Sequence, residues 1–115
     1  MFCAVYLAHR RQPPRALSAD HLGGRRLAHE RCDRFIELAG DRLVHVHAND
    51  NRGQFDEHLP PGEGAIDWRH IRDTLEQVGF DGWIVLELAC PVGPLAEYLG
   101  NAMERTRALF ASGCA

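Results

Sequence analysis

The fold is decided by residues 43–88, which read LVHVHANDNRGQFDEHLPPGEGAIDWRHIRDTLEQVGFDGWIVLEL. This stretch opens with a mostly apolar run at 43–48 and closes with another at 83–88, both of strand length. Between them, apolar residues recur at helical spacing over 68–78, with Asp67 placed to cap the start of a helix and Gly79 placed to end it. A strand, a helix and a second strand in this order predict two parallel strands joined by a right-handed crossover.

The same alternation extends on both sides of this unit. Residues 2–7 predict a first strand, residues 9–24 read as a loop, and the apolar spacing over 28–39 predicts a helix that ends at Gly40. We expect 83–88 to be a strand buried on both faces, followed by a last helix over 95–109 with Pro94 at its start. The whole pattern predicts an α/β protein of three parallel strands and three helices, with Trp68 and Trp83 in core or rim packing.

Composition places the chain among ordinary globular domains. It has 115 residues, 45% of them hydrophobic and 25% charged, and it lacks an apolar run of the roughly 20 residues that a membrane helix needs. The net charge of −3 and the scattered basic residues argue against nucleic acid as a partner. All 13 basic residues are Arg, which excludes a Schiff-base lysine. The four cysteines have no paired spacing and no secretory signal beside them, which predicts reduced thiols in a cytoplasmic protein.

Ionisable side chains interrupt the apolar strands at three places, and these are the candidates for chemistry. His45 and His47 alternate along one strand and therefore share a face, while Glu87 lies near the end of the next strand. If the two strands are neighbours, His47 and Glu87 reach one point at their carboxyl ends. The long segment 49–66 between them adds Asp50, Asp56, Glu57 and His58.

An imidazole and carboxylates that converge at the carboxyl ends of parallel strands are typical of a divalent-cation site for Mn²⁺, Co²⁺, Zn²⁺ or Mg²⁺. Simpler interpretations also fit the residues taken alone. His47 can be a satisfied buried histidine, Glu87 can pair with an arginine, and residues 56–58 can be a solvated loop.

Taken in order, HVHANDN, DEHLPPGEG and VLEL make a more specific pattern than any one of them. The pattern resembles the C-terminal part of the xylose-isomerase-like TIM barrels, the superfamily of sugar phosphate isomerases and epimerases and of apurinic endonucleases. The resemblance is strongest over 43–110. It implies that residues 1–115 form a single partial domain, the C-terminal (βα)3 portion of a (β/α)8 barrel.

The resemblance also implies roles for individual residues. His47 matches a metal-ligand histidine at the end of the seventh barrel strand, and Glu87 matches the carboxylate of the eighth, which binds metal and exchanges a proton with the sugar in epimerase-like members. Asp56 and His58 match residues that hold an additional zinc in the endonuclease branch. The resemblance also implies that Arg52 and His9 contact substrate. Arg52 lies one position away from the place of a substrate-contacting arginine in some epimerases of the family.

Two departures from the family pattern stand out. The sixth strand of the family often ends in the run Asp, any residue, Gly, His. In this chain the corresponding run is residues 6–9, and Tyr6 stands at the position of the metal-binding Asp. A phenol is a poor substitute for a carboxylate as a metal ligand. A complete barrel also needs roughly 250 residues. The isolated chain is therefore expected to be inactive, as a fragment, a truncated product, or a subunit whose barrel another chain completes.

The resemblance implies metal-assisted isomerisation or epimerisation of a sugar or polyol, with or without a phosphate, through an enediolate. One alternative is a zinc phosphodiesterase of the abasic-site type, in which Asp56 and His58 join His47 and Glu87. The other is a non-catalytic remnant, or a subunit that acts as a homo-oligomer or with a partner chain.

Overall fold

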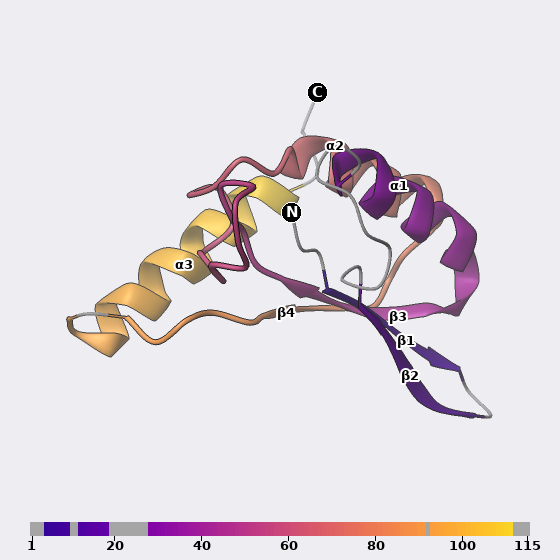
Figure 1. Ribbon diagram of the computed structural model, residues 1–115, viewed down its shortest axis with the longest axis horizontal. Helices are drawn as coiled ribbons and strands as arrows, with labels where there is room; N and C mark the ends of the chain where they lie inside the picture. The colour runs from indigo at the N-terminus through magenta and orange to yellow at the C-terminus, as the bar shows by residue number, and fades with distance from the viewer. Residues whose placement is uncertain (1–3, 10–11, 19–27, 92, 112–115) are drawn as a thin grey trace.

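The structure is a computed structural model that describes residues 4–9, 12–18, 28–91 and 93–111. Its strands form one sheet with helices packed beside it (Figure 1). The elements are β1 Ala4–His9, β2 Gln12–Ser18, α1 Ala28–Ala39, the short 3-10 helix η2 Gly40–Arg42, β3 Leu43–Ala48, α2 Trp68–Gln77, β4 Trp83–Leu86 and α3 Leu95–Phe110. In this described part, no helix is both long and apolar enough to cross a membrane.

The sheet has the strand order β2-β1-β3-β4. β3 and β4 are parallel, as the sequence predicts, and α2 connects them. β1 is antiparallel to both of its neighbours, β2 and β3. It follows that β2, β3 and β4 run in one direction, and each of them is followed by a helix.

The prediction of a first strand parallel to β3 is therefore wrong for β1, and the predicted loop over 9–24 contains β2. Only two residues separate the end of β1 at His9 from the start of β2 at Gln12, which allows a hairpin but not the crossover that parallel neighbours require. Pro13 and Pro14 favoured a loop in the sequence, but β2 lies at the edge of the sheet, where a strand tolerates proline. β2 thus takes the place of the first parallel strand, with β1 inserted between it and β3.

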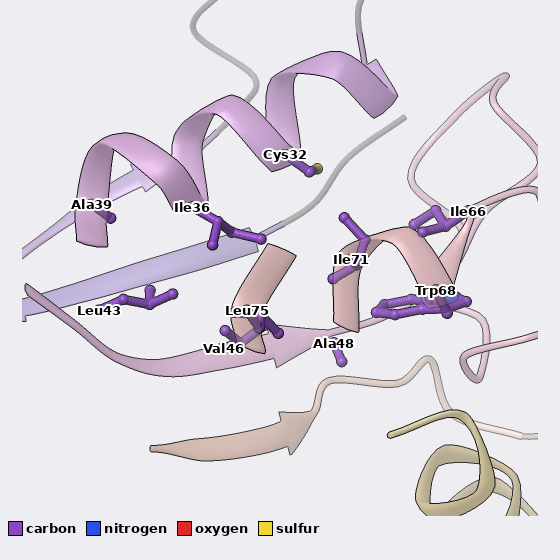
Figure 2. Close-up of a cluster of buried hydrophobic side chains, with 10 residues drawn as sticks. All are labelled: Cys32, Ile36, Ala39, Leu43, Val46, Ala48, Ile66, Trp68, Ile71 and Leu75. Atoms are coloured by element: carbon purple, nitrogen blue, oxygen red, sulfur yellow. The ribbon is translucent and has the colours of Figure 1, made fainter. Parts of the chain in front are cut away.

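The core lies between the sheet and the pair of helices α1 and α2, which run side by side over it (Figures 1 and 2). Both helices contribute apolar positions at helical spacing, and β3 contributes three of its six residues. The buried side chains are Cys32, Ile36 and Ala39 from α1, Leu43, Val46 and Ala48 from β3, Ile66, and Trp68, Ile71 and Leu75 from α2. Burying apolar surface of this kind contributes roughly 25 cal/mol per Å² to folding.

Helix α2 begins and ends where the sequence predicts. The carboxylate of Asp67 accepts a hydrogen bond of 3.1 Å from the backbone N–H of His70, which satisfies a donor of the first turn. Gly79 follows the helix with φ +70°, a conformation that favours glycine at a helix end. The start of α2 at Trp68 is therefore fixed relative to the segment that precedes it.

The two faces of the β3–β4 pair differ in burial. Val46 and Ala48 are buried against the helices, whereas His47 on the opposite face is half-buried. On β4, Trp83 is 80% exposed and Val85 is 42% exposed. The prediction that this strand is buried on both faces is wrong in this structure, because β4 is an edge strand and no described element covers its second face. Trp83, expected in core or rim packing, lies on this exposed face. Trp68, by contrast, is buried as expected.

Candidate metal centre at the carboxyl ends of β3 and β4

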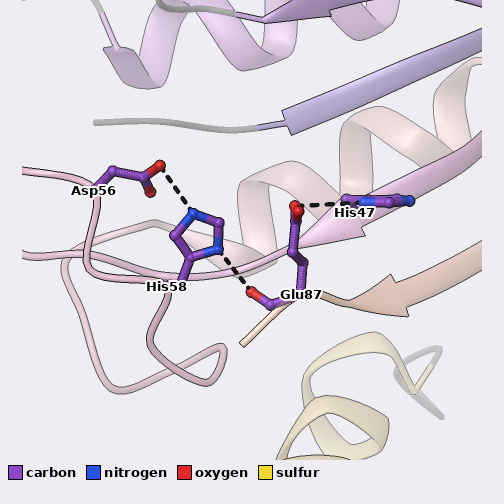
Figure 3. A network of polar contacts seen from close by, with 4 residues as sticks. All are labelled: His47, Asp56, His58 and Glu87. Atoms are coloured by element: carbon purple, nitrogen blue, oxygen red, sulfur yellow. Dashed lines mark hydrogen bonds and ion pairs between the residues drawn. The ribbon is translucent and has the colours of Figure 1, made fainter. Parts of the chain in front are cut away.

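His47 and Glu87 come together at the carboxyl ends of the two parallel strands. His47 is the second-last residue of β3, and Glu87 directly follows β4. Because His47 is paired with Val85, residues 47 and 87 lie on the same face of the sheet. The distance from His47 Nδ1 to Glu87 Oε2 is 3.4 Å, and the two side chains are 26% and 39% exposed (Figure 3). The convergence expected from the sequence is thus present.

Residues 56–58 are held against the end of β4. The ring of His58 lies between two oxygen atoms, with Nδ1 at 3.0 Å from the backbone oxygen of Glu87 and Nε2 at 2.9 Å from Oδ2 of Asp56 (Figure 3). The backbone oxygen of His58 also accepts a hydrogen bond of 3.0 Å from the N–H of Ala89. His58 has φ +51°, a backbone conformation that is strained for a non-glycine residue.

The contacts of His58 define its protonation. A neutral imidazole has one donor and one acceptor nitrogen, so it can donate to only one of the two oxygens. Burial lowers the pKa of His58, but the hydrogen bonds to the Glu87 carbonyl and the Asp56 carboxylate, together with the negative charges of both residues, raise it above the ordinary value of 6.5. The doubly protonated ring therefore fits this position best.

The position of Glu87 is fixed from both sides. Its backbone N–H donates a hydrogen bond of 3.2 Å to the carbonyl of Ala48 at the end of β3. On the other side, its carbonyl faces the ring of His58. The site consequently joins three segments that are distant in the sequence: the end of β3, the end of β4 and the loop between β3 and α2.

The remaining predicted site residues lie elsewhere. Arg52 is bound to Glu57 within the loop, through its guanidinium Nη1 at 2.5 Å and its backbone N–H at 2.7 Å. His9 ends β1, which is antiparallel to β3 and already pairs Leu7 with Leu43 at the beginning of that strand. The structure therefore places His9 at the opposite end of the sheet from His47.

The comparison of Tyr6 with a metal-binding aspartate also loses its basis. That comparison required residues 2–7 to be a strand parallel to β3, and β1 runs the other way. The strand with the required direction is β2, which ends at Ser18. Residues 19–27, which follow it, lie outside the described part of the chain.

Sequence reasoning missed the role of Asp50. The sequence suggests it as one of the ionisable side chains that the loop offers for chemistry, but it is fully buried and surrounded by N–H donors. The sequence does contain a signal: Asp50 comes two residues after the end of β3 and is flanked by Asn49 and Asn51, both of which are also buried.

The donor atoms of His47 and Glu87 fit two positions of a divalent-metal site. One nitrogen and one carboxylate oxygen, each bound at about 2.1 Å to the same tetrahedral ion, lie about 3.4 Å apart, which is the separation found between Nδ1 and Oε2. Among the residues that the structure describes, no group of three or more His, Cys, Asp or Glu side chains is arranged to hold a metal ion. The described residues therefore bring two candidate ligands together, and a complete metal site would need others.

A known protein family matches most of the chain. The family model described as xylose isomerase-like TIM barrel matches residues 14–109. The chain belongs to this family. The match starts within β2, so the antiparallel strand β1 lies outside it, whereas the alternating unit from β2 to α3 lies inside it. The predicted fold class, the C-terminal part of such an α/β barrel, is thereby confirmed.

Several known proteins are similar to this chain over parts of their length. The chain is 46% identical over 52 residues to an uncharacterised protein of Methanocaldococcus jannaschii, covering 45% of this chain and 18% of that protein. It is 32% identical over 77 residues to fructoselysine 3-epimerase of Escherichia coli O157:H7, and the match covers 66% of this chain and 28% of the epimerase. It is 33% identical over 64 residues to inosose dehydratase of Lacticaseibacillus casei, and the match covers 41% of this chain and 22% of the dehydratase.

A solved structure is also similar. The crystal structure of a D-tagatose 3-epimerase-like protein superposes with a TM-score of 0.56 and 30% identity, over 67% of this chain and 28% of that one. The chain thus spans between 18% and 28% of the length of these relatives.

Proposed function

We propose that this chain is part of a sugar isomerase or epimerase, in which His47 and Glu87 bind a divalent metal and Glu87 moves the substrate proton. The observation that carries the proposal is the 3.4 Å approach of His47 Nδ1 to Glu87 Oε2 at the carboxyl ends of β3 and β4. Sites of barrel enzymes lie at this end of the strands. The names of two relatives, a fructoselysine 3-epimerase and a D-tagatose 3-epimerase-like protein, support the reaction class.

Metal at this site would polarise a substrate carbonyl and its neighbouring hydroxyl, which makes the adjacent C–H bond more acidic. Mn²⁺, Co²⁺ and Zn²⁺ suit the imidazole and carboxylate pair, and Mg²⁺ suits it less because it prefers oxygen ligands. His47 serves only as a ligand, since a nitrogen committed to a metal cannot also accept a proton.

The carboxylate of Glu87 is the proton carrier in this proposal. Removal of the proton from a carbon beside a carbonyl leaves an enediolate, and Glu87 becomes a carboxylic acid. Return of a proton to the other face of the same carbon inverts it, and return to the neighbouring carbon isomerises the sugar. A second carboxylate, from outside this chain, would act on the opposite face.

Asp56 and His58 support Glu87 in this account. Both ring nitrogens of His58 already face oxygen atoms, one on Asp56 and one on the backbone of Glu87. Binding an additional zinc, as in the endonuclease alternative, would require His58 to give up one of these hydrogen bonds. The existing contacts therefore favour a positioning role.

The complete enzyme needs more strands than this chain provides. The face of β4 that carries Trp83 and Val85 is the face on which His47 lies, and it is exposed. We propose that additional strands, from a longer chain or from a partner, cover it and supply the other ligands. A cytoplasmic location suits the exposed thiol of Cys90, which would be kept reduced there.

The test is a chimera in which this chain replaces the matching segment of the fructoselysine 3-epimerase. With a panel of ketoses in deuterated water, incorporation of deuterium beside the carbonyl reports proton transfer. Replacing Glu87 by Gln should reduce that incorporation by a factor of at least about 100, the usual contribution of a general base. The matched control is Glu57→Gln, on the neighbouring loop, where only the contact with Arg52 is lost. Unchanged incorporation in the Glu87→Gln chimera would contradict the proposed role.

A further inference from the structure

The proposed reaction does not use the buried carboxylate of Asp50, although it is the most heavily hydrogen-bonded side chain around the site. Oδ1 accepts from the backbone N–H groups of Asn51 at 2.8 Å and Ile66 at 3.2 Å. Oδ2 accepts from the backbone N–H of Gly62 at 2.9 Å and from the indole N–H of Trp68 at 2.8 Å. The residue is fully buried, and four donors from four points of the chain meet at one carboxylate.

These contacts require a carboxylate. A buried carboxylate is tolerated only when hydrogen bonds replace its water, and all four donors here are N–H groups. An amide at the same position would turn its NH₂ group toward two of these donors. The start of α2 adds a favourable interaction, since the positive end of the helix dipole lies beside Ile66 and Trp68.

The glycines of the loop allow the backbone to close around this carboxylate. A Cβ at Gly64 would clash with Oδ1 of Asp50 and with the backbone oxygen of Asn51, so any side chain there is excluded. Gly62, which donates to Oδ2, has φ +92°, a conformation that disfavours other residues. The sequence PGEG therefore fits a loop built around Asp50.

Asp50 is also connected to the site through its backbone. Its N–H donates to the carbonyl of Leu59 at 2.7 Å, and its carbonyl accepts from the N–H of Leu59 at 2.8 Å. The neighbour of Leu59 is His58, whose ring and carbonyl contact Glu87 and Ala89. Hydrogen bonds and the peptide bond between His58 and Leu59 thus connect the backbone of Asp50 to the segment that carries Glu87.

We infer that Asp50 is a positioning residue of the candidate site: it binds no ligand itself, but it fixes the loop that holds Glu87 opposite His47. This inference rests on the proposed function only for the role of the site. The connection from Asp50 to Glu87 is independent of that function, because it follows from the contacts described above.

Amide hydrogen exchange of the metal-free chain tests the inference, in the wild type and in Asp50→Asn. We expect the N–H groups of Leu59, Gly62 and Ala89 to exchange roughly tenfold faster or more in the variant, because the amide leaves two of the four buried donors without an acceptor. Amides inside α2 and α3 should keep their wild-type rates. The control is Thr74→Val, which removes the hydroxyl hydrogen bond to the His70 carbonyl on α2 and should leave Ala89 unchanged.

Two results would overturn the inference. One is unchanged exchange at Ala89 in Asp50→Asn, and the other is an equal loss of protection in all helices, which would make Asp50 a determinant of global stability only. If Asp50→Asn fails to fold, Trp68→Phe takes its place, because it removes one of the four donors. We expect the same pattern of exchange with smaller changes. Unchanged exchange at Ala89 in Trp68→Phe would contradict the inference.

Metal affinity is measured separately in the chimera with fructoselysine 3-epimerase, by titration of the wild-type chimera and of its Asp50→Asn variant with Co²⁺. Weaker binding in the variant, by roughly tenfold, supports the positioning role, since displaced supporting residues typically cost 10–100-fold in affinity. Equal affinity in both proteins contradicts it. Absence of binding in the wild type would refute the proposed metal site, and the exchange pattern would still decide whether Asp50 fixes the loop.

Discussion

At the scale of the residue, the clearest electrostatic feature is the ring of His58 between the Asp56 carboxylate and the Glu87 carbonyl. These partners raise its pKa above 6.5 in spite of its burial. A group whose pKa is raised on folding stabilises the fold below its unfolded pKa, and this stabilisation is lost as the pH rises through the folded value. The hydrogen bonds of His58 should therefore weaken at alkaline pH.

An NMR titration of the metal-free chain checks this prediction directly. The His58 ring should titrate above 6.5, and Asp56→Asn should lower that pKa because it removes a hydrogen-bond acceptor and its charge. Asp73→Asn, which removes a carboxylate paired with Arg72 on α2, should have no effect. A pKa below 6.5 in the wild type would be inconsistent with the two contacts.

Two glycines give a second prediction at this scale. Gly64→Ala should destabilise the chain by about 2–4 kcal/mol, because the added Cβ clashes with Asp50 and the Asn51 carbonyl. Gly100→Ala is the matched control, since it lies in α3 with open space around it and should stabilise the helix by about 0.5–1 kcal/mol. Denaturant unfolding measures both, and equal effects of the two substitutions would contradict the packing around Asp50.

The sequence predicted the meeting of His47 and Glu87 because strand alternation and the parallel order are enough to place both residues at one edge. It did not predict the role of Asp50, because an aspartate in a long loop reads equally well as a ligand, a solvated group or a structural acceptor. Its four donors come from residues 51, 62, 66 and 68, and no periodicity relates those positions.

At the scale of the element, the unit from β3 through α2 to β4 was predictable, and the pairing of β1 was not. The helix has a capping aspartate and a terminal glycine, and its length suits a crossover between parallel neighbours. A short apolar run such as 2–7, in contrast, carries no information on direction. The direction of β1 follows from its hairpin with β2. β2 was not predicted, because its two prolines favour a loop.

Backbone NOEs test this topology. Antiparallel pairing of β1 with β3 places Val5 opposite Val46 and Tyr6 opposite His45, and predicts a short Hα–Hα contact within one of these pairs. Parallel neighbours do not give such a contact. NOEs typical of parallel strands between residues 4–7 and 43–46 would show that β1 has the direction first expected from the sequence.

At the scale of the whole molecule, the dominant feature is the uncovered face of β4. Trp83 is 80% exposed on an edge strand, a combination that promotes association with other chains. Trp83→Ser should therefore reduce concentration-dependent self-association in sedimentation velocity, with a change in unfolding free energy within about 0.5 kcal/mol.

Phe55→Ser is the control for this effect, because Phe55 is 62% exposed but lies on the loop and not on the sheet face. We expect it to leave self-association unchanged. Equal association of the wild type and Trp83→Ser would mean that the open face of β4 is not the surface that other strands cover.

The central claim is that His47 and Glu87 form one metal site, and elemental mass spectrometry tests it most directly in the chimera with fructoselysine 3-epimerase, where the remaining strands of the barrel are present. After dialysis against Mn²⁺, Co²⁺ or Zn²⁺, we predict bound metal in the wild type and in the control variant His45→Ala. His45 lies on β3 two residues before His47. The double variant His47→Ala, Glu87→Ala should bind none. Equal metal content in the wild type and the double variant, whether high or zero, would contradict the claim.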